Sequence, residues 1–210
     1  MTSHADHYLG AIIAASRAAV DGDMHAARSC LAPIAGEVWE RVPPWKPPAA
    51  RIGEKLTSGP RQSFSKSRAA DVFSRDRFQC RYCGQRLVPV CLLSVLSSSF
   101  PNELPYVSTY KRGSTHVVYW LIGAEADHIV PGTRGGDWID PANHADACVL
   151  CNTRKADWTL DELGWSLRPI QHLDWDGLVP VYHALWKLAG QPNPRYHTAW
   201  IRALESASAA

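Results

Sequence analysis

The chain has 210 residues, of which 46% are hydrophobic, a length that suffices for one catalytic domain with appendages or for two small domains. Its formal charge of +2 and its pI near 8.2 are compatible with a nucleic-acid partner but do not require one. The sequence has no apolar run of about 18 residues and no secretory-type start, which argues against a membrane span or an exported protein. We therefore expect an intracellular, cytoplasmic protein with no membrane partner.

Residues 1–40 are expected to form an N-terminal helical segment. Apolar side chains recur at helical spacing over 5–20 and again over 24–34. Asp21, Gly22 and Asp23 lie between the two patterns and are expected to separate two short helices.

Residues 41–66 are predicted to be a proline-rich, basic linker, because proline fixes φ and lacks an N–H group. Nine basic side chains between Arg51 and Arg86 face only three acidic ones. Such a local excess is typical of a stripe that binds a phosphate backbone, and a solvated flexible arm is the alternative interpretation. The nine are Arg51, Lys55, Arg61, Lys66, Arg68, Arg75, Arg77, Arg81 and Arg86.

Two Cys-x-x-Cys pairs, 64 residues apart, are the clearest ligand pattern in the chain. In a reducing compartment such pairs indicate one tetrahedral structural zinc site, and ordinary buried thiols are the alternative interpretation. A short helix starting at Ser67, a candidate N-cap, is expected to lead into the first pair. The four cysteines are Cys80, Cys83, Cys148 and Cys151.

The stretch 84–124 between the pairs is expected to be an insertion that contains a β-hairpin. Its residues 106–110 and 116–122 are rich in β-branched and aromatic side chains and flank a turn. After it, 127–131 is predicted as a strand, the following GTRGGD as its turn, and 147–156 as a helix.

Residues 159–210 are predicted to be a tryptophan-rich helical extension, with helical patterns near 179–189 and 196–204. The tryptophans are expected to anchor the core rather than to stack on bases. Two further cysteines have no partner at ligand spacing and are expected to be buried thiols. These residues are Trp158, Trp165, Trp175, Trp186 and Trp200, together with Cys30 and Cys91.

Several motifs follow one another in the centre of the chain: RDRFQCRYCG from Arg75, DHIVP from Asp127, the Gly-Gly of the turn, Asn143, and CNTRK from Cys151. Together they resemble the HNH endonuclease family of the ββα-metal fold. The resemblance covers roughly residues 67–158 and implies an α+β protein. In it, an HNH core with a four-cysteine zinc site would lie between helical N-terminal and C-terminal flanks.

The resemblance implies the roles of four residues. His128 is the expected general base, because an imidazole can accept a proton near neutral pH. Asp127 and Asn152 would hold one catalytic Mg²⁺ or Mn²⁺ through hard oxygen ligands, and Asn143 would tie the hairpin loop and orient His128. Adjacent side chains on a strand point to opposite faces, so Asp127 and His128 reach one phosphate only if the strand end is distorted.

Other polar residues near these motifs are assigned more simply. Lys155, Arg134 and Arg154 are candidates for contacts with DNA phosphates, and solvated side chains are an equal alternative. His144, next to Asn143, is expected to be structural rather than catalytic.

The sequence thus predicts a metal-dependent endonuclease that hydrolyses phosphodiester bonds in DNA, with duplex DNA as the expected substrate. From the resemblance to this family we expect a bacterial restriction or phage-defence enzyme. Two alternatives stay open, a non-catalytic zinc-stabilised nucleic-acid-binding module and an RNase or toxin nuclease. One HNH site cuts one strand, so double-strand cleavage would require a homodimer or sequential nicks.

Overall fold

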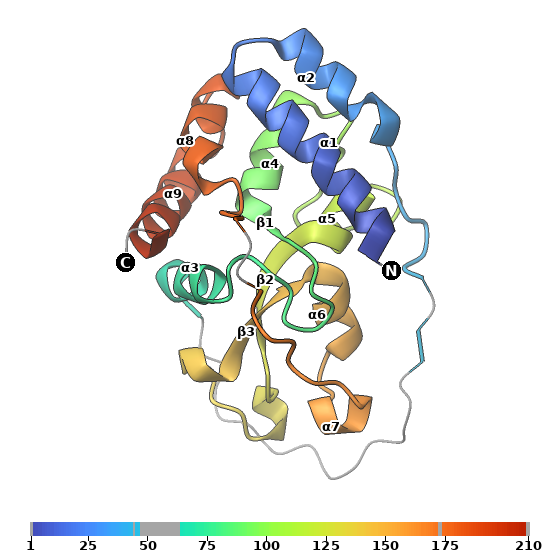
Figure 1. Ribbon diagram of the computed structural model, residues 1–210, viewed down its shortest axis with the longest axis vertical. Helices are drawn as coiled ribbons and strands as arrows, with labels where there is room; N and C mark the ends of the chain where they lie inside the picture. Colours follow the sequence, from blue (N-terminus) through green and yellow to red (C-terminus); the bar gives the residue numbers. More distant parts are fainter. Residues whose placement is uncertain (1, 44, 47–63, 172–173, 209–210) are drawn as a thin grey trace.

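The computed structural model describes residues 2–43, 45–46, 64–171 and 174–208, and it confirms the α+β class expected from the sequence (Figure 1). Helices α1, α2, α4, α8 and α9 gather in one half of the molecule, and the strands β2 and β3 with α6 and α7 lie in the other. In chain order the elements are α1 (Thr2–Val20), α2 (Met24–Leu31), η1 (Ala32–Ile34), α3 (Lys66–Arg75), β1 (Val88–Pro89), α4 (Val90–Ser99), α5 (Val117–Ile122), β2 (Gly123–His128), η2 (Gly132–Arg134), η3 (Pro141–Asn143), β3 (His144–Cys148), α6 (Val149–Lys155), α7 (Leu160–Leu163), α8 (Val179–Leu188) and α9 (Pro194–Ser208).

The helix termini follow local capping chemistry. The two N-terminal helices are confirmed, with the break where the sequence predicted it, because the Asp23 side chain accepts a hydrogen bond from the Ala26 N–H at 2.8 Å and caps α2. The predicted cap of α3 is wrong by two residues. Ser65, rather than Ser67, accepts from the Arg68 N–H, and Ser67 lies inside the first turn.

The insertion 84–124 is not the expected β-hairpin. Its first part forms α4, which buries side chains around most of its circumference, and its last part forms α5, capped by the His116 side chain. Residues 106–110 form a loop in which Tyr106 stacks on Tyr119 of α5, with ring centroids 4.2 Å apart. Short apolar runs do not distinguish a buried strand from a buried helix, and the surrounding core decides between them.

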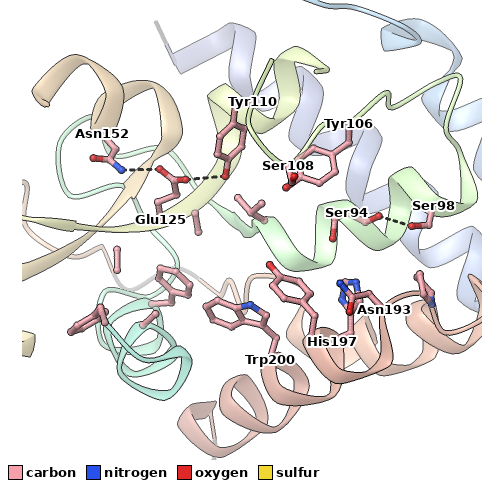
Figure 2. A pocket seen from close by; sticks show the side chains of 18 residues that line it. Ser94, Ser98, Tyr106, Ser108, Tyr110, Glu125, Asn152, Asn193, His197 and Trp200 are labelled. Carbon is pink, nitrogen blue, oxygen red and sulfur yellow. Dashed lines mark hydrogen bonds between the residues drawn. The ribbon is translucent and has the colours of Figure 1, made fainter. Parts of the chain in front are cut away.

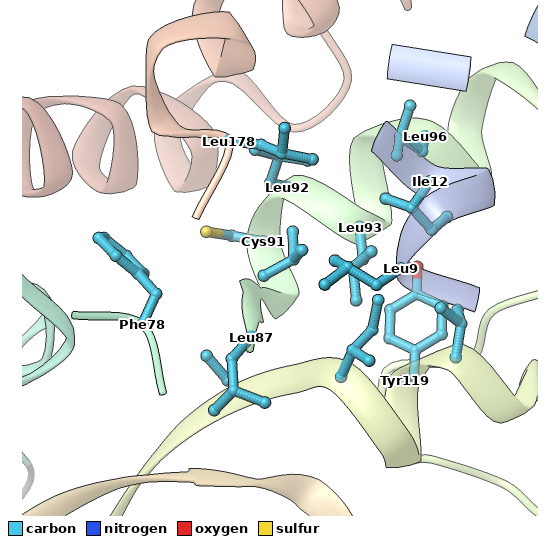
Figure 3. Packing of buried hydrophobic residues seen from close by; sticks show 14 of the residues in the cluster. Leu9, Ile12, Phe78, Leu87, Cys91, Leu92, Leu93, Leu96, Tyr119 and Leu178 are labelled. Carbon is cyan, nitrogen blue, oxygen red and sulfur yellow. The ribbon is translucent and has the colours of Figure 1, made fainter. Parts of the chain in front are cut away.

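The main hydrophobic core surrounds α4 (Figure 3). Leu9 and Ile12 of α1 lie beside Leu93 and Leu96 of α4, and Leu178, just before α8, lies beside Leu92. Burying a leucine stabilises a fold by about 1.5–3 kcal/mol, so these contacts bind the N-terminal, inserted and C-terminal segments into one core. The insertion is therefore central to the fold and not an appendage.

The sheet has the order β1-β2-β3 within the described residues. β1 pairs parallel with only the first two residues of β2, whereas β2 and β3 pair antiparallel from Ala124↔Cys148 to His128↔His144. The predicted strand at 127–131 is wrong in its bounds, because β2 ends at His128 and a loop follows. Helix α6 begins directly after β3, close to the helix predicted at 147–156.

The flanks agree with the sequence in part. Helices α8 and α9 stand where helical patterns were predicted. Of the five C-terminal tryptophans only Trp186 is buried, and the other four are half-buried. Most of the predicted linker, including Arg51, Lys55 and Arg61 of the basic stripe, lies outside the described residues. Within the described part of the chain, no helix combines the length and apolarity that a bilayer crossing requires.

Candidate active site

The four cysteines of the two Cys-x-x-Cys pairs converge at the base of the β2–β3 hairpin. Their sulfurs all lie within 4.8 Å of one another, and Cys83 Sγ is 4.0 Å from Cys148 Sγ. Tetrahedral zinc with Zn–S bonds of about 2.3 Å separates its sulfurs by about 3.8 Å. The cluster can therefore hold a metal ion such as zinc.

Both pairs use the same local turn. The N–H of Cys83 points at Cys80 Sγ at 3.5 Å, and the N–H of Cys151 points at Cys148 Sγ at 3.4 Å. Gly84 follows the first pair with φ of +82°, a conformation that glycine adopts without a steric penalty. Cys148 also caps α6, so the cluster joins the turn after α3 to the start of α6.

The other two cysteines lie away from this cluster. Cys91 is buried, as predicted, and burial raises the pKa of its thiol to about 12. Cys30 is half-buried, so the prediction of a buried thiol is wrong for it.

His128 is the last residue of β2 and packs among aromatic rings. Its ring centroid lies 4.2 Å from that of His144 and 5.1 Å from that of Trp138. His128 Nε2 is 3.3 Å from the Trp138 carbonyl oxygen. Because a carbonyl oxygen can only accept a hydrogen bond, the proton of the neutral ring lies on Nε2.

The neighbouring His144 is held in place by contacts of its own. Its side chain is fully buried, stacks on Phe64 with ring centroids 3.7 Å apart, and directs Nδ1 at the Asp140 carbonyl at 2.7 Å. Burial lowers the pKa of His144, which favours the neutral ring. The geometry agrees with the structural role expected from the sequence.

Asn143 connects the two sides of the hairpin loop. Its Oδ1 accepts from the Val130 N–H, and its Nδ2 donates to the carbonyls of Val130 and Asp137, all at 2.9 Å. A Cβ atom at Gly136 would lie 1.8 Å from the Val130 carbonyl, so only glycine allows this close approach. The loop tie predicted for Asn143 is present.

Asp127 points to the opposite face of the hairpin from His128, toward α6. Its Oδ2 accepts from the Tyr82 hydroxyl at 2.6 Å and lies 3.1 Å from Lys155 Nζ. Burial raises the pKa of Asp127, while Lys155 and Tyr82 act in the opposite direction. Strand pairing stays regular to His128↔His144, so a substrate phosphate could meet both side chains only across the end of β2.

Two of the three predicted phosphate contacts are wrong in this structure. Lys155 is fully buried and donates to the His128 carbonyl at 2.5 Å as well as pairing with Asp127. Arg134 forms a buried ion pair with Glu162. Arg154 is half-buried on α6, and its phosphate contact stays a prediction.

Glu125 is the polar residue that sequence reasoning missed. Its Oε2 accepts from Asn152 Nδ2 at 2.7 Å and its Oε1 from the Tyr110 hydroxyl at 2.9 Å (Figure 2). The available signal was the spacing Glu-x-Asp in a strand, which puts Glu125 and Asp127 on one face. Glu125 fixes the amide of Asn152, whose Oδ1 is turned away from the carboxylate.

Asp127 and Asn152 present oxygen atoms of the kind that binds hard divalent cations. Both described contacts of Asp127 use Oδ2, which leaves its Oδ1, and Asn152 offers its Oδ1. Carboxylate and amide oxygens are ligands that Mg²⁺ and Mn²⁺ prefer. Because Lys155 already neutralises Asp127, we expect such an ion to bind weakly and to exchange.

Comparisons with models of protein families, with curated proteins and with solved structures find no match for this chain.

Proposed function

We propose that the protein is a metal-dependent endonuclease of the HNH type, which hydrolyses DNA phosphodiester bonds with His128 as general base. One observation carries the proposal: the β2–β3–α6 unit holds the His128 ring at a strand end, where the Trp138 carbonyl orients it. The Asn143 loop tie and the four-cysteine cluster at the start of α6 support it.

In this mechanism the His128 imidazole removes a proton from the water that attacks the phosphorus. The Trp138 carbonyl accepts a hydrogen bond from Nε2–H, holds the ring in this tautomer and stabilises the imidazolium that forms. His144, neutral and 4.2 Å away, adds no positive charge that would oppose proton uptake. A divalent cation held by Asp127 and Asn152 would stabilise the charge that develops on the phosphate.

A second candidate is a non-catalytic, zinc-stabilised nucleic-acid-binding module. The buried Asp127–Lys155 pair favours it, because a carboxylate already neutralised by an ammonium group attracts a cation less strongly. The two candidates differ in whether phosphodiester bonds are broken.

Incubation with supercoiled plasmid, duplex and single-stranded oligonucleotides and RNA, with Mg²⁺, Mn²⁺ or EDTA, separates these candidates. We expect nicking of DNA that requires the divalent cation. Cleavage confined to RNA would favour the RNase alternative. Binding without cleavage in either cation would overturn the proposal in favour of the binding module.

The four-cysteine cluster can be tested independently. Elemental analysis should find about one zinc per chain, and Cys148→Ser should lose the metal and lower the melting temperature, because such sites contribute directly to folding. Cys30→Ser is the matched control and should keep both properties. Purified protein without zinc would contradict this assignment.

A further inference from the structure

A cavity of about 690 Å³ opens beside β2, next to the proposed catalytic residues (Figure 2). Glu125 and Asn152 form part of its wall, and α3, α4, α9 and the loop 106–110 enclose the rest. β1 covers only the first two residues of β2, so the strand edge at Glu125 and Ala126 borders this space. Its volume lies in the usual range for small-molecule sites.

Flat aromatic side chains line the cavity and are held in place by their neighbours. Tyr106 is stacked on Tyr119 with an interplanar angle of 14°, and Trp200 on Phe73 with an angle of 12°. The Tyr110 hydroxyl is tied to Glu125. These contacts fix the planes of the rings, so a flat ligand could stack on them at a low entropic cost.

Polar groups alternate with these rings. Ser94 and Ser98 of α4 donate to carbonyls of their own helix and offer acceptor oxygens to this space. Ser108 of the loop and Asn193 before α9 add groups that can donate or accept. On one wall, Tyr196 carries Lys66 Nζ over its ring, 5.3 Å from the centroid, which places a cation close to the cavity. Aromatic faces, hydrogen-bonding edges and a nearby cation match a nucleotide better than a purely apolar ligand.

We propose that this cavity receives an unstacked nucleobase of the substrate strand, close to the scissile phosphate. The inference rests on the proposed nuclease function. Glu125 lies three residues before His128, which is about 10 Å along a strand, so the base would belong to a nucleotide near the cleaved bond. A carboxylate accepts hydrogen bonds, so Glu125 favours a base with an exocyclic amino group, such as cytosine, over thymine.

The test measures binding without cleavage, using the full zinc-loaded chain with His128→Ala. Fluorescence anisotropy compares fluorescein-labelled dC8, dT8 and an eight-unit abasic strand with the same backbone. We expect dC8 to bind roughly tenfold or more tightly than the abasic strand, since stacking of one base is worth about 1–3 kcal/mol, and more tightly than dT8.

Two tryptophan substitutions provide the matched pair. Ser108 lines the cavity and the adjacent Thr109 is exposed outside it. Ser108→Trp should fill the cavity and remove the difference between dC8 and the abasic strand, whereas Thr109→Trp should preserve it. Equal binding of dC8 and the abasic strand, or equal behaviour of the two variants, would overturn the inference, and equal binding of dC8 and dT8 would overturn the role of Glu125.

A cleavage assay of the unmutated protein distinguishes failure of the base site from failure of the proposed nuclease function. DNA cleavage together with equal binding of dC8 and the abasic strand would refute the base site and leave the nuclease. Base-dependent binding without cleavage of DNA or RNA would refute the nuclease and leave the base site.

Discussion

The two faces of strand β2 have opposite chemical characters. On the face toward α6, the carboxylates of Glu125 and Asp127 are met by a buried ammonium group, two tyrosine hydroxyls and an amide. On the other face, His128 lies against His144 and Trp138, and the Trp138 carbonyl orients its ring. Strand β2 thus has neutralised carboxylates on one face and, on the other, the imidazole that we propose as general base. Substitutions on the two faces should therefore have different consequences.

The largest effect is expected on the imidazole face. His128→Ala should reduce cleavage by about 10²–10⁴-fold, since positioned proton transfer typically contributes that much, while zinc content and melting temperature stay unchanged. A quantitative nicking assay measures the rate.

His183→Ala is the matched control, because this histidine is exposed on α8. His144→Ala is a poorer control, since its ring packs against His128. If His128→Ala cleaved DNA at the full rate, His128 would not be the general base, and the proposed difference between the two faces of β2 would be wrong.

On the carboxylate face, loss of a charge partner should affect stability first. Lys155→Met leaves Asp127 buried without its ammonium partner, and such a change destabilises proteins by about 3–5 kcal/mol. Urea denaturation measures the free energy of unfolding. The exposed Lys187→Met is the control, and adding Asp127→Asn to Lys155→Met should recover part of the loss. Equal stability of the two single variants would show that the pair does not stabilise the fold.

Asn143→Ala should make the loop between β2 and β3 less rigid on the side of His128. Three hydrogen bonds of about 0.5–1.5 kcal/mol each are removed, so a total destabilisation of about 1.5–4.5 kcal/mol is expected. Because the loop also holds Trp138, cleavage should fall although zinc is retained. The exposed Asn102→Ala serves as control, and an unchanged cleavage rate in Asn143→Ala would argue against the loop tie as a positioning device.

The smallest expected effect is a pH dependence of stability. Burial lowers the pKa values of His116, His144 and His197 below the ordinary value near 6.5, so below that pH the unfolded chain binds protons that the folded chain does not. Each of these histidines therefore reduces stability as the pH falls, by at most about 1.4 kcal/mol per pH unit. The raised pKa of Asp127 works in the opposite direction.

His144→Phe keeps a ring against Phe64 and removes one titrating group. The loss of stability between pH 7.5 and 5.5, measured by urea denaturation, should be smaller in this variant than in the unmutated protein. An equal or larger loss would mean that His144 is not held neutral in the fold.

The spacing of residues in the sequence was sufficient to predict the parts of the site that lie within one turn or one hairpin. The two Cys-x-x-Cys turns and the order of hairpin and α6 follow from residues close together in the sequence or joined by one hairpin. The loop tie of Asn143 was predicted from the resemblance to the HNH family. The N-terminal and C-terminal helices were predictable for the same reason, since periodic apolar side chains are a local signal.

Tertiary packing decided the rest. Lys155 and Arg134 resemble surface cations in the sequence, but Asp127 and Glu162, each more than 25 residues away in the sequence, pair with them in the interior. The apolar runs of the insertion became helices because α8 packs against α4 and α1 packs against α5. A buried charge and a short apolar run are both determined by distant neighbours, and these neighbours are known only when the chain is folded.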